Sequence, residues 1–399
     1  MDFQLSEDQI VTQKWAHEFA EKEIRPAAPE YDESEEFPWP VVTKAAEIGL
    51  YTLDFWTETV AQDQSGLTLP IVMEETSWGC GGIGLAIFGT GLPLAALAYS
   101  ATPDQFLEWG PKMFGTAEDP KVGAFAVSEP NAGSDVSALR TTARRDGDGW
   151  VLNGTKVFIT NGGIANVHVV VATVDPELGH RGQAAFVIGP DTPGIRQGKK
   201  EKKLGIRASH TAEVILDDCR IPLGNVVGGI EKLEAKMERA RSRDAVSPRS
   251  SQALRTFEMT RPSVAAQAIG IGRAAFEFSR DYARERSAFG RPIIEHEGIA
   301  FKLADMATEL DAARLLVWRA SWMSRNGSEF PNAEGSMSKL KASEVAVSVT
   351  EQAVQILGGY GYIKDFPVEK WYRDAKIYTI FEGTSEIQRL VISRALARG

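Results

Sequence analysis

Cysteine is scarce in this chain: its 399 residues include only Cys80 and Cys219, and the two form no Cys-x-x-Cys pair. A disulfide scaffold and a cysteine-rich metal site are therefore excluded, and a reducing cytoplasm is the expected environment. The five histidines, at positions 17, 168, 180, 210 and 296, show no i, i+4 pairing. We predict no metal site from them.

An excess of positive charge is also missing, because 54 acidic residues against 44 basic ones give a formal net charge of -10. That sign disfavours a protein that works by neutralising the phosphates of nucleic acid. One segment differs: residues 236–255 hold six basic and two acidic side chains. It is interpreted either as a solvated helix and loop or as a patch that recognises phosphate.

The chain has no uninterrupted apolar run of the roughly 20 residues that cross a bilayer. The most apolar stretch, residues 79–101, carries no charge, but seven glycines and prolines interrupt it. This pattern predicts buried core or a cavity wall. The first residues, MDFQLSEDQI, contain neither a basic nor an apolar targeting region, so we expect a soluble, cytoplasmic protein without a membrane span.

Several nucleotide and nucleophile motifs are absent. Neither GxxxxGK[ST] nor GxSxG occurs, which excludes P-loop phosphoryl transfer and the usual nucleophile elbow. Gly79, Gly81 and Gly84 match GxGxxG, but the helical segment 71–78 precedes them. A dinucleotide-binding turn needs a strand at that point, so this match is not interpreted as a cofactor site.

Hydrophobic periodicity divides the chain into three parts. Helical spacing runs from Ser6, a candidate cap, to about residue 114, and a period of two follows to about residue 225, with residues 146–149 as a turn. Helical spacing then returns to the end. The prediction is an N-terminal helical domain, a middle β domain and a C-terminal helical domain, bounded as 1–120, 121–228 and 229–399.

Two segments are unusual for simple packing. Residues 127–135, VSEPNAGSD, form a turn whose composition suits an anion such as a diphosphate, although ordinary turns share that composition. Residues 380–389, IFEGTSEIQR, place Glu382 before a Thr384 cap and a final helix. A carboxylate on this apolar loop would be desolvated and would make a better base; the alternative is an acid that complements a helix dipole.

These segments and three others occur in the order and spacing of the acyl-coenzyme A dehydrogenases, and the chain resembles that family from residue 5 to residue 389. The resemblance implies a mostly α fold with an α domain, a β-barrel-like domain and a C-terminal four-helix bundle. It also implies FAD, a role in fatty acid metabolism, and a homotetramer or dimer. The five segments are 125–135, 153–162, 285–290, 355–361 and 381–384.

The resemblance assigns roles to individual residues. Phe125, Val127 and Ser128 would line the flavin, with Phe158 and Thr160 on its opposite face. The remaining cofactor contacts include Thr384 and Glu386 after the loop, Gly133 and Ser134 near the diphosphate, and four residues that would reach the FAD of a neighbouring subunit: Arg286, Phe289, Gln355 and Gly359. Substrate contacts are implied for Ser134, Thr260, Arg261 and Gly383.

Glu382 matches the family's catalytic base. In that role its carboxylate takes the α-proton of an acyl thioester while the β-hydride leaves for flavin N5. Its backbone N–H and a cofactor hydroxyl would hold the thioester oxygen. Some family members carry the base at the position of Thr260, which cannot accept the proton, so Glu382 is the only candidate. The resemblance implies an electron-transferring flavoprotein as the electron acceptor.

The substrate prediction depends on the charge-free stretch 79–101, which corresponds to part of the family's acyl cavity. It offers no arginine to pair with a terminal carboxylate, so an apolar acyl chain is favoured. Phe88 is a candidate for the bottom of that cavity, but Trp78, Tyr99 and Tyr378 are bulky too, and no chain length follows from them.

Two other functions on the same fold stay open. A flavin-dependent oxidase or monooxygenase usually lacks a glutamate in the FEGT loop, so Glu382 argues against it. A nucleic-acid-associated flavoprotein would need a basic face, for which residues 236–255 are the only support.

Overall fold

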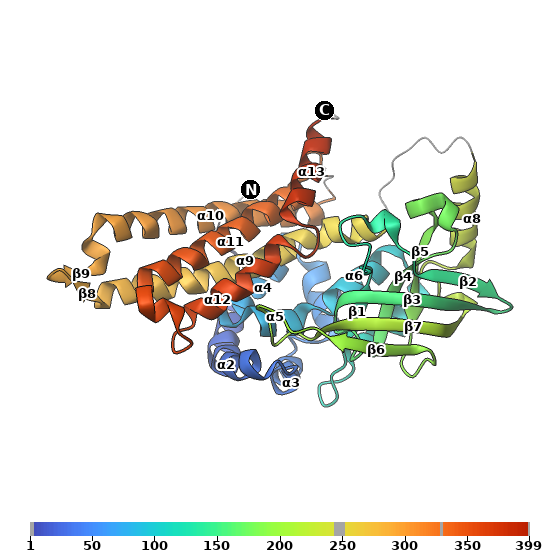
Figure 1. Ribbon diagram of the computed structural model, residues 1–399, viewed down its shortest axis with the longest axis horizontal. Helices are drawn as coiled ribbons and strands as arrows, with labels where there is room; N and C mark the ends of the chain where they lie inside the picture. The colour runs from blue at the N-terminus through green and yellow to red at the C-terminus, as the bar shows by residue number, and fades with distance from the viewer. Residues whose placement is uncertain (1–3, 243–251, 328–329, 398–399) are drawn as a thin grey trace.

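The computed structural model describes residues 4–242, 252–327 and 330–397, and Figure 1 shows them as two helical regions joined to a sheet at one end. Helices of the first third come first, seven strands follow, and long helices return. The mostly helical architecture with a β region in the middle is the one predicted from the hydrophobic periods.

The N-terminal region is a set of helices joined by short turns. Ser6 caps the first helix as predicted: its hydroxyl accepts from the Gln9 N–H, and the Gln9 side chain accepts from the Ser6 N–H. Pro26 lies in the first turn of α2, where its missing N–H leaves no hydrogen bond unmade. The helices are α1 Glu7–Phe19, α2 Arg25–Ser34, α3 Trp39–Glu47, α4 Thr68–Gly79, α5 Gly81–Phe88, α6 Gly91–Ser100 and α7 Pro103–Phe114.

The middle region is a seven-stranded mixed sheet with the order β1-β4-β2-β3-β7-β6, in which β5 pairs with β4 as well. The predicted turn at 146–149 joins β2 to β3, whose antiparallel register begins at Asp146 opposite Gly149. The strands are β1 Gly123–Ala126, β2 Thr142–Asp146, β3 Gly149–Thr160, β4 Val167–Thr173, β5 Gln183–Ile188, β6 Ile195–Lys200 and β7 Thr211–Pro222.

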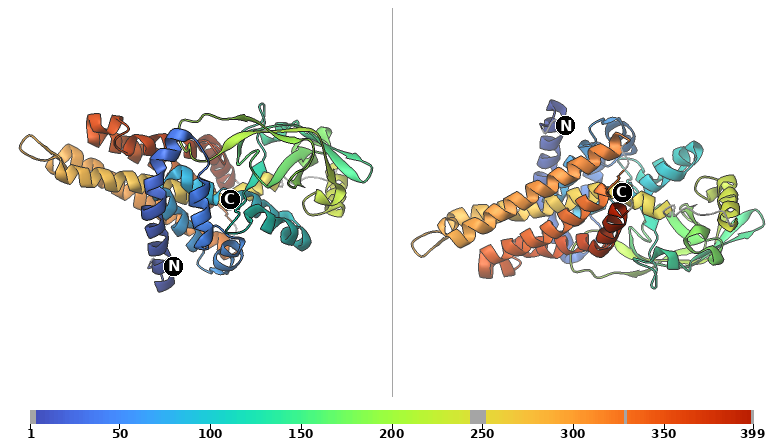
Figure 2. Two further views of the ribbon diagram at one scale, coloured as in Figure 1. Left: turned by 90° about the horizontal axis from the view of Figure 1, so that it is seen from below. Right: turned by 90° about the horizontal axis from the view of Figure 1, so that it is seen from above.

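The C-terminal region is built around the long helices α9, α10 and α11, which run side by side in both views of Figure 2. At the end far from the sheet, a small hairpin of β8 Ser287–Ala288 and β9 Arg291–Pro292 joins α9 to α10 (Figure 1). The helices are α8 Ile230–Arg241, which lies against the sheet, then α9 Gln252–Glu285, α10 Glu297–Arg325, α11 Glu334–Leu357, α12 Val368–Ala375 and α13 Ser385–Leu396.

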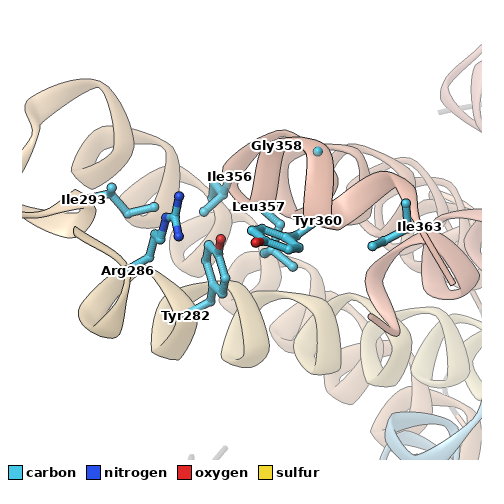
Figure 3. A pocket seen from close by; sticks show the side chains of 9 residues that line it. Tyr282, Arg286, Ile293, Ile356, Leu357, Gly358, Tyr360 and Ile363 are labelled. Carbon is cyan, nitrogen blue, oxygen red and sulfur yellow. The ribbon is translucent and has the colours of Figure 1, made fainter. Parts of the chain in front are cut away.

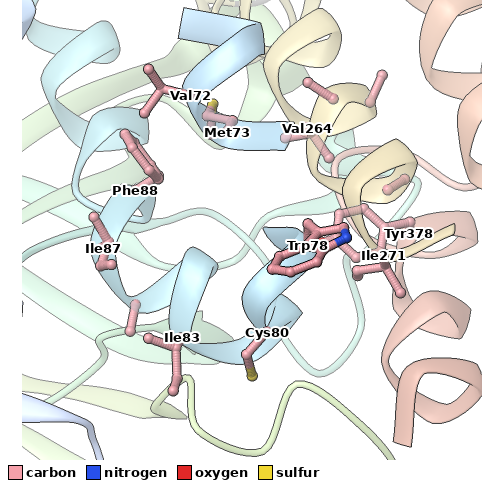
Figure 4. Packing of buried hydrophobic residues seen from close by; sticks show 14 of the residues in the cluster. Val72, Met73, Trp78, Cys80, Ile83, Ile87, Phe88, Val264, Ile271 and Tyr378 are labelled. Carbon is pink, nitrogen blue, oxygen red and sulfur yellow. The ribbon is translucent and has the colours of Figure 1, made fainter. Parts of the chain in front are cut away.

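The charge-free stretch forms α5 and α6 in the interior. One segment of the described chain, Gly81–Ser100, is long and apolar enough to cross a membrane, but 78% of its most apolar window is buried inside the fold. Figure 4 shows Ile83, Ile87 and Phe88 of this stretch in the same apolar cluster as Val264 and Ile271 of α9. The prediction of buried core for this stretch is confirmed. The shared cluster places α5 beside α9.

Candidate active site

Glu382 and Gly383 form a tight turn between α12 and α13. Both residues have left-handed backbones, with φ of 51° and 91°. Position 383 favours glycine because a φ of 91° is strained for a residue with a side chain, and a Cβ there would also displace Nε2 of Gln388, which lies 2.7 Å away. The turn ends at Thr384, which caps α13 by accepting from the Ile387 N–H at 3.3 Å. The predicted cap is confirmed, and the positive φ values place Glu382 and Gly383 in a non-helical turn just before α13.

The carbonyl groups of this turn are held from behind. Lys339 of α11 donates from Nζ to the Gly383 carbonyl oxygen at 2.7 Å. Nε2 of Gln388 donates to the same oxygen at 2.8 Å and to the Glu382 carbonyl at 3.2 Å. Because these bonds compensate a strained backbone, the left-handed conformation at Glu382 is fixed by its surroundings.

The Glu382 carboxyl group is surrounded by protein atoms, although the residue as a whole is half-buried. Thr260 Oγ1 of α9 donates to Glu382 Oε2 at 2.9 Å. Burial raises the pKa of Glu382 to about 7, against the opposing effects of the Thr260 hydroxyl and the positive charges of Arg261 and Lys339. A carboxyl group with a pKa near neutrality suits general-base catalysis.

Three of the four predicted substrate contacts lie beside this carboxyl group, whereas the fourth, Ser134, lies in an exposed segment after β1. Thr260 and Arg261 are consecutive residues of α9, and Arg261 is only 2% exposed. Its Nη1 donates to Ser336 Oγ on α11 at 2.7 Å, and its Nη2 would lie 3.5 Å from a Cβ at position 383. The structure therefore brings together Thr260, Arg261, Glu382 and Gly383, as the sequence predicts.

Apolar side chains extend from this group toward the N-terminal region. Tyr378 is fully buried and packs edge-on against Phe381 at 5.0 Å between ring centroids. Figure 4 shows Tyr378 and Trp78 near Val264 and Ile271 of α9, with Phe88 at the other end of the cluster. This wall is suited to an uncharged ligand.

Three further predicted residues lie at the end of β1: Phe125 belongs to the strand, and Val127 and Ser128 follow it. Phe125 and Ser128 are half-buried and Val127 is buried. Ser128 accepts from the Val157 N–H at 2.9 Å through its carbonyl oxygen. Underneath, Lys156 Nζ donates to the Val127 carbonyl at 2.9 Å and to Glu129 Oε1 at 2.7 Å.

Phe158 and Thr160 lie near the end of β3 and define what we call the Phe158 edge; Phe158 is exposed and Thr160 is half-buried. Phe158 has a φ of 57° and its side chain is 69% exposed. Thr160 Cγ2 would lie 3.2 Å from a Cβ at Gly89, the residue that follows α5, so this edge adjoins the apolar wall. An aromatic side chain in a left-handed backbone and open to solvent indicates a surface that a ligand covers.

Gly133 and Ser134 are exposed and directly follow a turn over residues 129–132. A reciprocal pair of backbone hydrogen bonds between Glu129 and Ala132 closes that turn, each at 3.0 Å. A Cβ at Gly133 would meet nothing within 4 Å, so its backbone is open to a ligand. Glu386, in the first turn of α13, is also exposed; hydrogen bonds from its own backbone N–H and from Thr384 lower its pKa.

A second group of predicted cofactor residues lies elsewhere in the chain. Arg286 and Gly359 line a cavity of about 500 Å³ between α9 and the end of α11, together with Tyr282 and Tyr360 (Figure 3). Gln355 is exposed one turn earlier on α11, and Phe289, at the β8–β9 hairpin, is 97% exposed. Figure 1 shows this end of α9 at the opposite end of the molecule from the sheet. One chain therefore does not bring the two groups together.

Four positioning residues were missed by the sequence analysis: Lys339, Gln388, Lys156 and Glu129. Both lysines are fully buried. The available signal was a lysine on a face of small or apolar residues, as Lys339 is on α11 between Ser336 and Ser343. Buried lysines are rare unless they are paired, so such a position predicts a specific partner.

The basic segment 236–255 is only partly described. Lys236 donates to the Gln183 carbonyl, and Arg241 pairs with Asp175 at 2.8 Å, so both side chains attach α8 to the middle region. Residues 243–251, with two more of the six basic side chains, lie outside the described residues, and so does the side chain of Arg255. Within the described residues, no group of three or more histidine, cysteine, aspartate or glutamate side chains could hold a metal ion.

Three sequence families match consecutive parts of the chain. Their descriptions are acyl-CoA dehydrogenase N-terminal domain for residues 6–116, middle domain for residues 124–219 and C-terminal domain for residues 250–397. The short-chain specific acyl-CoA dehydrogenase of Rattus norvegicus mitochondria is 42% identical over 396 residues, which cover 99% of this chain and 91% of the relative.

Solved structures agree with this match. The butyryl-CoA dehydrogenase of Megasphaera elsdenii has a TM-score of 0.89 at 35% identity, with all of both chains covered. A chain from a structure of the electron transferring flavoprotein of Acidaminococcus fermentans also has a TM-score of 0.89, at 38% identity and full coverage of both chains.

The chain belongs to the acyl-CoA dehydrogenase family, which is a family of FAD-dependent oxidoreductases. The predicted fold, reaction class and cofactor are thereby confirmed. The geometry also fits the cofactor: the uncovered Phe158 edge and the open glycine turn at 133 offer one surface, and the cavity beside Arg286 offers another.

Proposed function

We propose that this protein desaturates short, apolar acyl-CoA thioesters at the α,β-position, with Glu382 as the base that removes the α-proton. The observation that carries this proposal is the Glu382 carboxyl group, held by Thr260 at 2.9 Å and given a pKa of about 7 by burial. Ordinary surface glutamates are far weaker bases, because water stabilises their ionised form.

The chain's own residues have separate parts in the reaction. The Glu382 carboxylate accepts the α-proton, and the backbone N–H of Glu382, together with a hydroxyl of the bound cofactor, would hold the thioester oxygen on which negative charge develops. The buried positive charges of Arg261 and Lys339 lie close enough to favour the ionised carboxylate. Bound FAD supplies the acceptor for the β-hydride. Ser128, Phe158 and Thr160 are the residues that would orient it.

A short acyl chain is favoured by the packing around Phe88. Phe88 is buried and its ring lies 6.2 Å from both the Phe55 and Trp56 rings, which forms an aromatic block at the end of the wall that begins at Tyr378. Both α5 and α6 are free of charged side chains, so a terminal carboxylate would lack a partner there. The similarity to short-chain specific relatives supports the same substrate class.

The proposed holoenzyme is a homo-oligomer, a tetramer or a dimer, in the cytoplasm. The separation of the Arg286 cavity from the Phe158 edge supports an FAD that contacts two subunits. Retention of FAD should then depend on oligomerisation, and a monomer that holds FAD tightly would contradict this point. The similarity to a chain from an electron transferring flavoprotein structure supports such a flavoprotein as the electron acceptor.

A substrate panel tests the proposed function. Purified yellow protein is mixed without oxygen with butanoyl-, octanoyl-, hexadecanoyl- and glutaryl-CoA, and the loss of flavin absorbance is followed. We expect fast bleaching by butanoyl-CoA. Bleaching by hexadecanoyl-CoA and by glutaryl-CoA should be slower by at least about 10-fold, which is the usual effect of one poorly accommodated group in a binding site. Equal bleaching by all four would contradict the short apolar site.

The pH dependence of activity follows from the raised pKa of Glu382. Because the free enzyme must have this carboxyl ionised, kcat/KM should fall about tenfold per pH unit below the pKa of about 7 and level off above it. The measurement is kcat/KM for butanoyl-CoA from pH 5.5 to 9. A profile that is flat down to pH 5.5 would show that the base is an ordinary, solvated carboxylate.

A further inference from the structure

Lys339 is a buried, positively charged residue on α11 that neither gives nor takes a proton in the proposed reaction. Its side chain is completely buried, and its Nζ donates to the Gly383 carbonyl at 2.7 Å. Burying an ammonium group is costly unless its charge is compensated, so a buried lysine points to a specific partner. Lys339 acts on the Glu382–Gly383 turn in two ways, through a hydrogen bond and through its charge.

The first effect of Lys339 is to hold the backbone of the turn in place. Glu382 and Gly383 are consecutive left-handed residues, a conformation that is unfavourable for glutamate. The Gly383 carbonyl receives two donors, Lys339 Nζ and Gln388 Nε2, and the Gln388 donor also reaches the Glu382 carbonyl. Lys339 is the donor that ties the turn to α11, whereas Gln388 ties it to α13, the helix that the turn itself begins.

The second effect of Lys339 is electrostatic and acts on the Glu382 carboxyl group. The charged groups that act on Lys339 are Glu382, Arg261 and Glu386. Burial and the neighbouring Arg261 lower the pKa of Lys339 to about 8, because they outweigh the two carboxylates, so the ammonium form still predominates at neutral pH. In the opposite direction, the Lys339 charge lowers the pKa of Glu382.

We propose that Lys339 is a positioning residue that fixes the Glu382–Gly383 turn and whose positive charge favours the ionised form of the Glu382 carboxyl group. This inference rests on the proposed role of Glu382 as the base. It separates Lys339 from Gln388, which shares the hydrogen-bonding role but carries no charge. The two residues therefore give a matched pair for experiment.

The test compares Lys339→Met with Gln388→Met in the FAD-loaded enzyme. Both variants remove a donor from the Gly383 carbonyl, but only Lys339→Met removes a charge. We expect the acid limb of the kcat/KM profile to move up by about one pH unit in Lys339→Met, as an opposite charge at close range shifts a carboxyl group. Between pH 8 and pH 6 the kcat/KM of this variant should therefore fall by about fivefold more than that of the parent, because at pH 8 the variant is itself only half ionised. Gln388→Met should lose rate at every pH without moving the limb.

Hydrogen exchange in the absence of substrate provides a readout that does not depend on turnover. Peptides that cover residues 378–390 should exchange at least several-fold faster in Lys339→Met and in Gln388→Met. Lys341→Met is the matched control, because Lys341 lies on the same helix but pairs with Glu309 at the surface. It should change neither the pH profile nor the exchange.

Three results would overturn the inference. They are an unmoved acid limb in Lys339→Met, the same shift in Gln388→Met, and unchanged exchange over 378–390 in both variants. If Lys339→Met does not fold, Lys339→Gln serves instead, since it keeps a donor and removes the charge, and the same pH shift is required of it. A Glu382→Gln variant distinguishes the failures: if it still bleaches its flavin, the proposed base is wrong, whereas if it is inactive and Lys339→Met behaves like the parent, only the inference about Lys339 is wrong.

Discussion

Glu382→Gln should yield a yellow protein that binds acyl-CoA but reduces its flavin more slowly by about 10² to 10⁴ or more. The amide preserves the size of the side chain, and it can still accept the hydrogen bond that Thr260 Oγ1 donates at 2.9 Å. It cannot accept the α-proton. Since loss of the α-proton and of the β-hydride is concerted or nearly so, no other route to the product stays open.

The measurement for this variant is anaerobic single-turnover bleaching with butanoyl-CoA, together with thioester binding by titration. Binding should change little, because the loss lies in the chemical step. Glu351→Gln, an exposed acid on α11, is a control that should bleach at the parent rate. Bleaching of Glu382→Gln within a few fold of the parent would mean that another group is the base.

Lys156→Met should release FAD and destabilise the protein by about 3 to 5 kcal/mol, which is the usual cost of leaving one member of a buried ion pair without its partner. Lys156 is fully buried, and its Nζ lies 2.7 Å from Glu129 Oε1. The same ammonium group holds the Val127 carbonyl, one residue before Ser128. Both the stability of the middle region and the predicted flavin surface depend on this one side chain.

Flavin content by absorbance and urea unfolding measure the two effects of Lys156→Met. Adding Glu129→Gln to Lys156→Met removes the uncompensated carboxylate and should restore part of the stability. Lys199→Met is the control, because Lys199 is an exposed residue that pairs with Glu201 on the surface. Full FAD content and unchanged urea unfolding in Lys156→Met would show that the pair does not support the flavin surface.

Local signals in the sequence predicted much of the fold. The capping box at Ser6, the turn at 146–149 and the cap at Thr384 are fixed by residues within three positions of each other, and all three form as expected. The period of two also predicted the β character of the middle region. It did not define every strand there, because β4 and β5 are buried at every position and β6 is largely exposed, so none of these three shows clear alternating burial.

The candidate site was predicted only in part, for a similar reason. Glu382 is conspicuous locally, because an acid in an apolar loop before a helix is unusual. Lys339 lies 44 positions before Gly383, and Lys156 lies 27 positions after Glu129, so their partners are set by the fold. No pattern of neighbouring residues in the sequence indicates either of these two pairings. The separation of the Arg286 cavity from the Phe158 edge likewise depends on the length of α9, which only the structure shows.

The most direct test of the account separates proton removal from hydride transfer. An acyl-CoA in which sulfur replaces the β-carbon has no β-hydrogen to lose, so only the α-proton can react. The FAD-loaded enzyme is incubated with this thioester in D₂O, and deuterium at the α-carbon is measured by mass spectrometry. The account predicts enzyme-dependent exchange that is slower by at least about 10² in Glu382→Gln. Equal exchange in the parent and in Glu382→Gln would contradict the assignment of Glu382 as the base.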